Sequence, residues 1–253
     1  MVSTPTLAAD PSLPRPARDG PQRWRWSQHW RDLLFTHWRV PESRLRPFLP
    51  PGLVLDLRDG SAWVSAVAFR LERVRPRYFP AFGPVSNFLE LNLRTYVSWR
   101  GEPAIFFLSI HANSRIAVTL ARLCTPLPYR HARIAYAESA GDWEYQATRR
   151  VGRERRPIFR ATFSPATPRA EVAAESLDAW LLERYGAFFA GKPGRLVRMV
   201  VRHPRWQVQE VRPEVSACDL GEPWGLDLGR PPDCAHFSTG VRALVAPFEE
   251  VWF

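Results

Sequence analysis

The sequence predicts an α+β domain built mainly of antiparallel strands, with two or three helices. Three observations predict this class. Residues 89–99 alternate strictly between apolar and polar side chains, residues 104–111 form an apolar run after a short turn, and residues 176–189 show side chains at helical spacing. Alternation with a period of two is typical of a strand with one face against a core, and a short turn between two such runs indicates a hairpin.

The hairpin over residues 89–111 has the clearest pattern in the chain. Its first strand is apolar on one face, and the other face consists of Glu90, Asn92, Arg94, Tyr96 and Ser98. The turn is expected at residues 100–103, which contain Gly and Pro. The returning strand is apolar on both faces until Ser109 and His111, so we expect it to be more buried than its partner.

Three segments carry helix signals. Asn113 or Ser114 can cap a short helix, which residues 125–126 end. Pro41 suits the first turn of another helix. The clearest helix is expected over residues 176–189. The side chains at helical spacing there are Leu177, Trp180, Leu181, Arg184, Tyr185 and Phe188, and a glycine follows as the stop.

Further strands complete a sheet-dominated chain. We expect them at residues 33–38, 54–57, 62–71, 133–137, 143–148, 158–163, 196–201, 206–211 and 237–245. Gly, Pro and charged residues separate the shorter ones, as is usual between strands. Residues 73–84 contain three prolines and three aromatic side chains and are expected to form a long loop over a pocket mouth.

Length and composition indicate one domain with one substantial core. The chain has 253 residues, 45% of them hydrophobic, with 11 Trp and 15 Phe, and sheet-rich domains of this size are often single. Residues 1–28 contain five prolines, so we expect a disordered tail there and a single domain over residues 29–253. The chain shows neither the apolar run of a signal peptide nor the roughly 20 apolar residues of a membrane span. This predicts a soluble, cytoplasmic protein.

Charge and cysteine usage narrow the function classes only slightly. The formal net charge is +10, and Lys192 is the only lysine. The arginines are spread along the whole chain and do not gather in one run, which does not favour nucleic-acid binding. Cys124, Cys218 and Cys234 are widely spaced, so we expect free thiols in a reducing compartment, with Cys124 in the core.

The sequence contains none of the short motifs that bind nucleotides or metals or that present a catalytic serine. It has no phosphate-binding loop, GxGxxG, HExxH or GxSxG, and its six histidines never occur at ligand spacing. We therefore predict neither a metal nor a cofactor, and we interpret isolated histidines at strand ends as hydrogen-bonded structural residues.

The polar face of residues 89–99 is the best candidate for chemistry. Glu90, Asn92 and Arg94 lie two apart, so their side chains emerge on one side at steps of about 6.6 Å. If that face points into a cavity, the three groups can bind a carboxylate or carbonyl group, and the carboxyl can supply a proton. The competing interpretations are a solvent-facing strand with ordinary charges and a buried Glu–Arg network with a structural role.

Several separated motifs resemble one family. They are HWRVPESRLRPFLPPGL at residues 37–53, ELNLRTYV at 90–97, ARLCTPLPYRHARI at 121–134, LLERYGAFF at 181–189 and HPRW at 203–206. They occur in the order expected for the YqjF-like bacterial proteins, a group of unknown function in the acetoacetate decarboxylase-like superfamily. The resemblance covers the chain from Trp30 to its end, and it implies a closed, cone-like barrel whose active site lies inside.

The resemblance also shows what this chain lacks. In acetoacetate decarboxylase, the segment corresponding to ARLCTPLPYRHA looks like GRE followed by G-x-PKK, and one of its lysines forms a Schiff base. Here Arg122 matches the arginine and Pro128 the proline, whereas Tyr129 and Arg130 stand where the lysine pair would be. Glu90 is the counterpart of a preceding acidic residue. Because a guanidinium cannot act as the amine nucleophile, imine chemistry is not inherited, and Tyr129 remains as an acid or hydrogen-bond donor.

We therefore predict that the protein binds a small anionic or carbonyl-bearing molecule inside the barrel, without Schiff-base chemistry. The expected site has Glu90 and Tyr129 as catalytic candidates and, as ligand-binding residues, Asn92, Arg94, His111, Arg122 and Arg130. One open alternative is a lyase, isomerase or hydrolase that uses Glu90 as acid–base group and arginines as anion stabilisers. A structural protein with a filled barrel and a nucleic-acid binder are the others. The sequence determines neither the ligand nor the oligomeric state.

Overall fold

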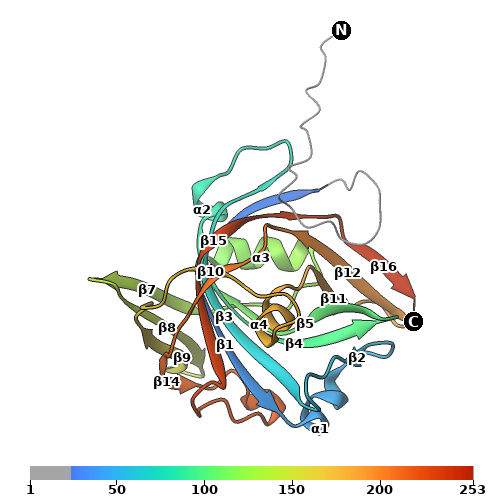
Figure 1. Cartoon of the computed structure of the whole chain (residues 1–253). Coiled ribbons are helices and arrows are strands. Elements are labelled where there is room, and N and C mark those ends of the chain that lie inside the picture. The colour runs from blue at the N-terminus through green and yellow to red at the C-terminus, as the bar shows by residue number, and fades with distance from the viewer. Residues whose placement is uncertain (1–23, 253) are drawn as a thin grey trace.

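The computed structural model describes residues 24–252, which form a large sheet, a smaller sheet and short helices (Figure 1). The central strands of the large sheet are, in order, β15 (Cys234–Val245), β1 (Trp26–Val40), β3 (Ala62–Pro76), β4 (Phe88–Trp99), β5 (Glu102–Ala112), β11 (Gly186–Ala190) and β12 (Arg195–Arg202). β12 also pairs with β15, so the order of hydrogen-bonded strands closes into a ring. Neighbours in the ring are antiparallel except β5 and β11, which confirms the mainly antiparallel α+β class.

Shorter strands and a second sheet surround the ring. The short strands are β2 (Val54–Leu55), β6 (Tyr129–His131), β10 (Ala170–Glu171), β13 (Gln207–Glu210) and β16 (Glu249–Trp252). The second sheet consists of β14 (Glu214–Cys218), β9 (Glu154–Phe163), β8 (Asp142–Val151) and β7 (Arg133–Ser139), in this order. Leu91 and Leu93 of β4 pack in one cluster with Tyr145 and Phe159 of this sheet. The outer face of β4 is therefore covered.

β4 and β5 form the predicted hairpin. They pair antiparallel around Arg100 and Gly101, which have positive φ angles of 51° and 81°. Two left-handed residues give the turn a twist that matches that of the strands, and glycine adopts this conformation without steric cost. The register shifts between Leu93 and Arg94, and such a bulge bends the strand where the polar face lies.

The polar face of β4 points into the ring. Glu90 lies opposite Phe69 of β3, and Asn92 lies opposite Val67. Both β3 residues belong to the apolar cluster that also contains Phe35 of β1. Glu90 and Asn92 are only 5% and 4% exposed, so the interpretation of this strand as solvent-facing is wrong. β4 contributes buried polar groups to an otherwise apolar interior.

The helices are short: α1 (Glu42–Leu45), α2 (Gly83–Ser86), α3 (Arg115–Cys124) and α4 (Leu177–Leu182), with 3-10 turns at Arg46–Phe48 and Glu222–Trp224. The Ser114 hydroxyl caps α3 by accepting the Ala117 backbone N–H at 3.2 Å, which confirms one of the two predicted caps. The buried side of α3 consists of Ala117 and Val118. Its larger apolar residues face solvent, and so does Cys124. The prediction of Cys124 as a core residue is therefore wrong.

The helix predicted over residues 176–189 is shorter than expected. It ends at Leu182, and residues 186–190 form β11. β11 pairs with β12 and β5, and its apolar run is buried on both faces, with Phe189 inside the ring and Phe188 in a separate cluster. A short apolar run is compatible with the periodicity of a helix and with that of a strand. Pairing with distant strands makes this segment a strand.

The prediction of a disordered tail over residues 1–28 lies outside the described residues, except at 24–28. In that stretch β1 already begins at Trp26. Within the part of the chain that the structure describes, no helix combines the length and the apolarity needed to cross a membrane.

Candidate functional site

A buried carboxyl group with two hydrogen-bond donors lies at the centre of the candidate site. The Tyr129 hydroxyl donates to Glu90 Oε2 at 2.7 Å, and Asn92 Nδ2 donates to Oε1 at 3.1 Å. β6 pairs parallel to β5 and places Tyr129 opposite Ile110, which in turn lies opposite Asn92. Tyr129 therefore shares the inner face with Glu90, although 39 residues separate them in sequence.

Burial makes the Glu90 carboxyl group a weaker acid than an exposed glutamate. Desolvation of the carboxylate raises the pKa of Glu90 from 4.5 to about 7, although the hydrogen bonds from Tyr129 and Asn92 lower it. Burial and the neighbouring Glu90 raise the pKa of Tyr129 well above its ordinary value, so Tyr129 remains a neutral donor. A carboxyl group with a pKa near neutrality can both give and take a proton at working pH.

Arg94 continues the same face. Within the part of the chain that the structure describes, its buried Nε and Nη2 atoms have no hydrogen-bond partner, and the same is true of Asn92 Oδ1. Among residues 24–252, Arg94 forms no ion pair with a carboxylate. Its guanidinium lies 5.7 Å from the ring centre of Phe35, and the side chain as a whole is half-buried. Some of its surface therefore stays accessible although the strand face points into the ring.

A second guanidinium lies near Arg94. Arg184 follows α4 and is held by Asp56 at 2.6 Å and by the Trp180 carbonyl at 2.7 Å. It lies over the ring of Tyr96, 5.3 Å from the ring centre, and its Nη2 has no partner. Burial mainly, and Arg184 in addition, lower the pKa of Arg94. Asp56 offsets one of the two positive charges of Arg94 and Arg184. The remaining positive charge favours an anionic ligand.

Sequence reasoning missed a chain of polar groups beside Arg94. Ser65 Oγ lies 2.5 Å from the Tyr96 hydroxyl and 2.6 Å from His37 Nδ1. His37 Nε2 lies 3.3 Å from His236 Nδ1, and His236 Nε2 lies 3.1 Å from Asp178 Oδ1. The available signal was the presence of a serine and a histidine inside apolar runs, but nothing local shows that these residues meet.

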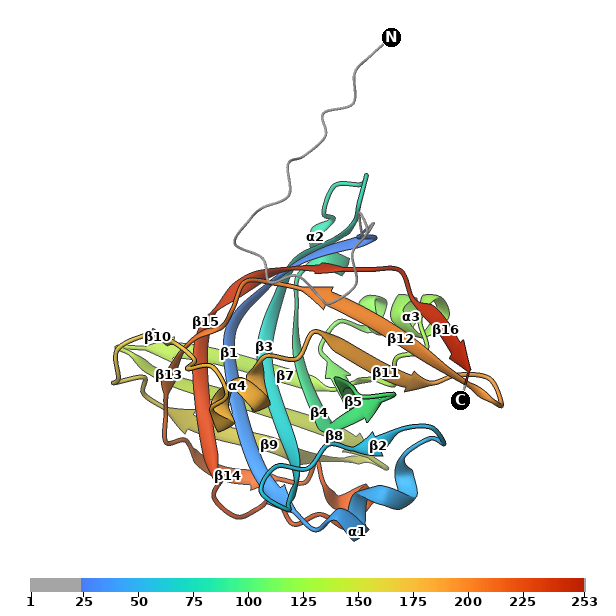
Figure 2. The same cartoon turned by 45° about the vertical axis from the view of Figure 1, so that its right-hand side comes forward.

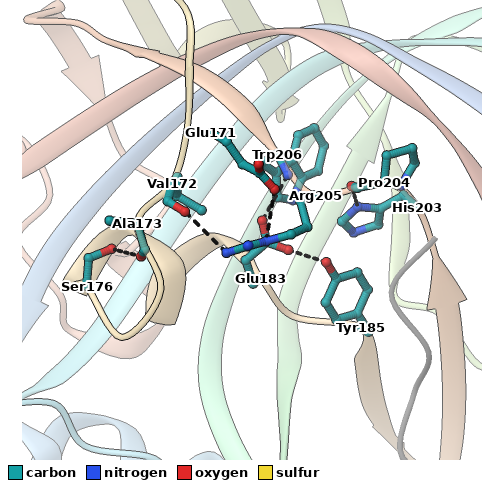
Figure 3. A network of polar contacts seen from close by, with 10 residues as sticks. All are labelled: Glu171, Val172, Ala173, Ser176, Glu183, Tyr185, His203, Pro204, Arg205 and Trp206. Carbon is teal, nitrogen blue, oxygen red and sulfur yellow. Dashed lines mark hydrogen bonds and ion pairs between the residues drawn. The ribbon is translucent and has the colours of Figure 1, made fainter. Parts of the chain in front are cut away.

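The HPRW segment packs against Glu183 and Tyr185 in the middle of LLERYGAFF (Figure 3). The Trp206 backbone N–H donates to Glu183 Oε1 at 2.8 Å, and the Tyr185 hydroxyl donates to the other carboxylate oxygen. The rings of Tyr185 and His203 are 4.7 Å apart, and Trp206 meets Phe35 edge-on at 5.1 Å. These contacts hold the two segments together and place Trp206 in the same apolar cluster as Phe35.

Three of the predicted ligand-binding residues lie away from Glu90. His111 lies opposite Leu91, on the outer face of the sheet, where burial mainly and then Arg130 and Arg149 lower its pKa to about 4. Arg130 is exposed. Arg122 is also exposed, and its Nε donates to the Tyr129 carbonyl at 2.7 Å. The structure thus places the side chains of Glu90, Asn92, Arg94 and Tyr129 on the inner face. The His111 side chain lies on the outer face, and Arg122 and Arg130 are exposed, with Arg122 bound to the backbone of Tyr129.

A metal site is not part of this arrangement. Within residues 24–252, no group of three or more His, Cys, Asp or Glu side chains is placed to hold a metal ion. The polar groups around Glu90 and Arg94 are a carboxyl, an amide, a phenol and guanidinium groups. This set of hydrogen-bonding groups suits an organic anion.

Comparison with known proteins places the chain in a family. Residues 27–242 match the DUF2071 family, described as an uncharacterized conserved protein. The uncharacterized protein YqjF of Bacillus subtilis (strain 168) is 33% identical over 227 residues, which cover 90% of this chain and 93% of YqjF.

Solved structures with the same fold have much lower sequence identity. Acetoacetate decarboxylase from Legionella pneumophila has a TM-score of 0.64 at 14% identity, with 99% of this chain and 98% of that chain covered. An acetoacetate decarboxylase-like enzyme from Sphingomonas wittichii RW1 has a TM-score of 0.63 at 16% identity, over 91% and 94%. The enduracididine biosynthesis enzyme MppR complexed with pyruvate has a TM-score of 0.62 at 14% identity, over 89% and 90%. The chain belongs to the DUF2071 family of YqjF-like proteins and has an acetoacetate decarboxylase-like fold.

Proposed function

We propose that this protein binds a small organic molecule bearing a carboxylate or carbonyl group inside the ring of strands, and that the ring is a closed, cone-like barrel. One observation carries the proposal: on the inner face, two buried nitrogens of Arg94 have no partner among residues 24–252. A buried cation without a counter-ion is costly. Nε and Nη2 are the neighbouring donors of the guanidinium fork that binds a carboxylate bidentately, so an anionic ligand would satisfy both.

The other inner-face groups suit the same ligand. Asn92 Oδ1 lacks a donor, so it can accept a hydroxyl or amide hydrogen of the ligand. Glu90 lies four residues before Arg94 on the same face of β4, about 13 Å along the strand, and Asn92 lies between them, so one ligand can contact Arg94 and Asn92 together. MppR, a structural neighbour, is known in complex with pyruvate, a molecule with both a carboxylate and a carbonyl group. We therefore take pyruvate as the probe for this site.

The pKa of Glu90 favours a second candidate function, catalysis of proton transfer on that ligand. A general acid–base group works best when its pKa lies near the working pH, and burial brings the pKa of Glu90 to about 7. The protein would then be a lyase, isomerase or hydrolase in which Glu90 moves the proton, Tyr129 donates a hydrogen bond to it and Arg94 stabilises the anion.

Binding can be tested on the protein as purified. Native mass spectrometry should detect a co-purified small acid, and isothermal titration with pyruvate should show binding that methyl pyruvate does not reproduce, because the ester has no carboxylate for Arg94. Equal binding of the two would contradict the role of Arg94. Absence of both a co-purified molecule and pyruvate binding would leave the proposal without support and favour the structural alternative.

Schiff-base chemistry is not part of the proposal. Lys192 is exposed in the turn between β11 and β12, where it lines an open pocket of about 510 Å³ together with Cys124 and Phe248. Imine formation needs a neutral amine, which proteins obtain by burying a lysine or placing it near another cation.

We expect borohydride treatment with pyruvate to leave the intact mass unchanged, whereas acetoacetate decarboxylase treated in the same way serves as the positive control. A stoichiometric adduct that maps to Lys192 and disappears in Lys192→Arg would contradict this expectation.

A further inference from the structure

A continuous hydrogen-bonded chain connects the inner face of the ring with the protein surface. It runs from Tyr96 through Ser65, His37 and His236 to Asp178 on α4, with successive distances of 2.5, 2.6, 3.3 and 3.1 Å. The first three residues are 0% exposed and His236 is 3% exposed, whereas the Asp178 side chain is 46% exposed. α4 packs across the inner face of the ring at this place (Figure 2).

The direction of the chain follows from chemistry. The hydrogen bond from His236 is the first cause that lowers the pKa of Asp178, so Asp178 is a carboxylate and only accepts. His236 Nε2 must then carry a hydrogen, and in the neutral ring Nδ1 accepts from His37 Nε2. His37 Nδ1 is left as an acceptor. Ser65 Oγ lies 2.6 Å from it and the Tyr96 hydroxyl 3.4 Å, so the nearer Ser65 donates to His37 and accepts the hydrogen of Tyr96. Every hydroxyl and ring N–H in the chain therefore points outward, toward Asp178.

The inner end of the chain lies at the proposed ligand site. Tyr96 and Arg94 lie on the same face of β4, and a hydrogen bond between them opposes the lowering of the Arg94 pKa by burial. The charged groups that face the chain are Arg94 and Arg184 at Tyr96 and Arg94 at His37. Burial raises the pKa of Tyr96, and both cations oppose this shift because they stabilise negative charge on the tyrosine oxygen.

We propose that Tyr96, Ser65, His37, His236 and Asp178 form a proton-conducting chain that removes a proton from a ligand held on Arg94 and releases it to solvent at Asp178. This inference rests on the proposed function, because it needs a ligand at Arg94. It gives the site a second acid–base group, on the side of Arg94 opposite to Glu90, and it assigns Tyr96 to contact the ligand while the other four residues act through it.

At each step of the proton transfer, one bond to hydrogen breaks and another forms. The bond between the ligand and its hydrogen breaks, and that hydrogen binds the Tyr96 oxygen as the original phenolic hydrogen passes to Ser65. The serine hydrogen passes to His37 Nδ1, the Nε2 hydrogen of His37 passes to His236 Nδ1, and the Nε2 hydrogen of His236 passes to Asp178. The electron pair of the broken bond stays on the ligand, whose new negative charge lies next to Arg94. Asp178 then loses the proton to water.

The tautomers provide a test that needs no ligand. At about pH 8, above the ordinary pKa of histidine, long-range ¹H–¹⁵N correlation spectra should show His37 and His236 both protonated at Nε2. His203 is the internal control with the opposite tautomer, because its Nδ1 lies 2.8 Å from the Pro204 carbonyl, which can only accept. Protonation of His37 at Nδ1 under these conditions would reverse the chain and overturn the proposal.

Conduction itself is measured by hydrogen exchange at the buried ring N–H of His37. Asp178→Asn and His236→Gln should slow this exchange by about a hundredfold, the lower end of what a positioned acid–base group contributes. The indole N–H of Trp63 is the control for local opening, because it is buried without a partner and lies outside the chain. Its exchange should stay unchanged.

Equal rates for the His37 proton in wild type and both variants, or parallel changes at His37 and Trp63, would overturn the conducting chain. Pyruvate titration of the same variants separates this inference from the proposed function. If pyruvate binds the wild type but the His37 proton exchanges at the same rate in the wild type and both variants, only the proton-conducting chain is refuted. If pyruvate does not bind the wild type, the ligand site is refuted, and the exchange rates still test the chain.

Discussion

Replacement of Arg94 by methionine is expected to weaken pyruvate binding by about 2–5 kcal/mol, the usual effect of removing one partner of a buried charge pair. The same change should leave the protein as stable as before or more stable. Arg94 has two buried nitrogens without a partner, and replacement of a buried charge by an apolar side chain of similar length is often neutral or stabilising. If Arg94 were a structural residue, its replacement would instead destabilise the protein, because the hydrogen bond to Tyr96 and the contact with the Phe35 ring would be lost.

The measurement combines isothermal titration with pyruvate and unfolding in urea. Arg130→Met is the matched control, because it removes the same charge from an exposed position and should change neither binding nor stability beyond about 0.5 kcal/mol. Strong destabilisation by Arg94→Met together with unchanged pyruvate binding would show that Arg94 is a structural residue.

Replacement of Glu90 by glutamine is expected to stabilise the protein above neutral pH. Burial raises the pKa of Glu90 from 4.5 to about 7 in the folded state. Between these values the folded protein binds more protons than the unfolded chain, so stability falls as the pH rises through this window. At about 1.4 kcal/mol for each pKa unit, ionised Glu90 costs about 3 kcal/mol at pH 8. Glutamine keeps the shape and removes the ionisation.

The test is urea unfolding of wild type and Glu90→Gln at about pH 4 and about pH 8, where the difference in free energy should grow from near zero to about 3 kcal/mol. Tyr129→Phe is the companion variant. It removes a hydrogen bond that lowers the Glu90 pKa, so its stability should fall more steeply with pH than that of the wild type. Parallel pH profiles for wild type and Glu90→Gln would show that Glu90 titrates normally.

The sequence predicts the hairpin and its polar face correctly because both depend on neighbouring residues. Alternation assigns Glu90, Asn92 and Arg94 to one face whatever the rest of the chain does, and the Arg100–Gly101 turn sets the pairing with β5. The serine cap of α3 is local in the same sense. Tyr129 is predicted as a site residue only through the family resemblance, and its hydrogen bond to Glu90 is known only from the structure.

The sequence alone does not predict features that depend on pairing with distant strands. Residues 186–190 have an apolar run that fits a helix or a strand, and pairing with β5 and β12 makes it a strand. The returning strand is apolar on both sides, so only its register against β4 shows that His111 faces outward.

The contact between His37 and His236 joins residues 199 positions apart, through the pairing of the first and fifteenth strands. The amino-acid sequence alone therefore determined which groups β4 offers, because side-chain alternation is a property of a single strand. Which partners those groups meet was decided only by the closure of the ring, because it brings α4, β1, β6 and β15 to the same interior.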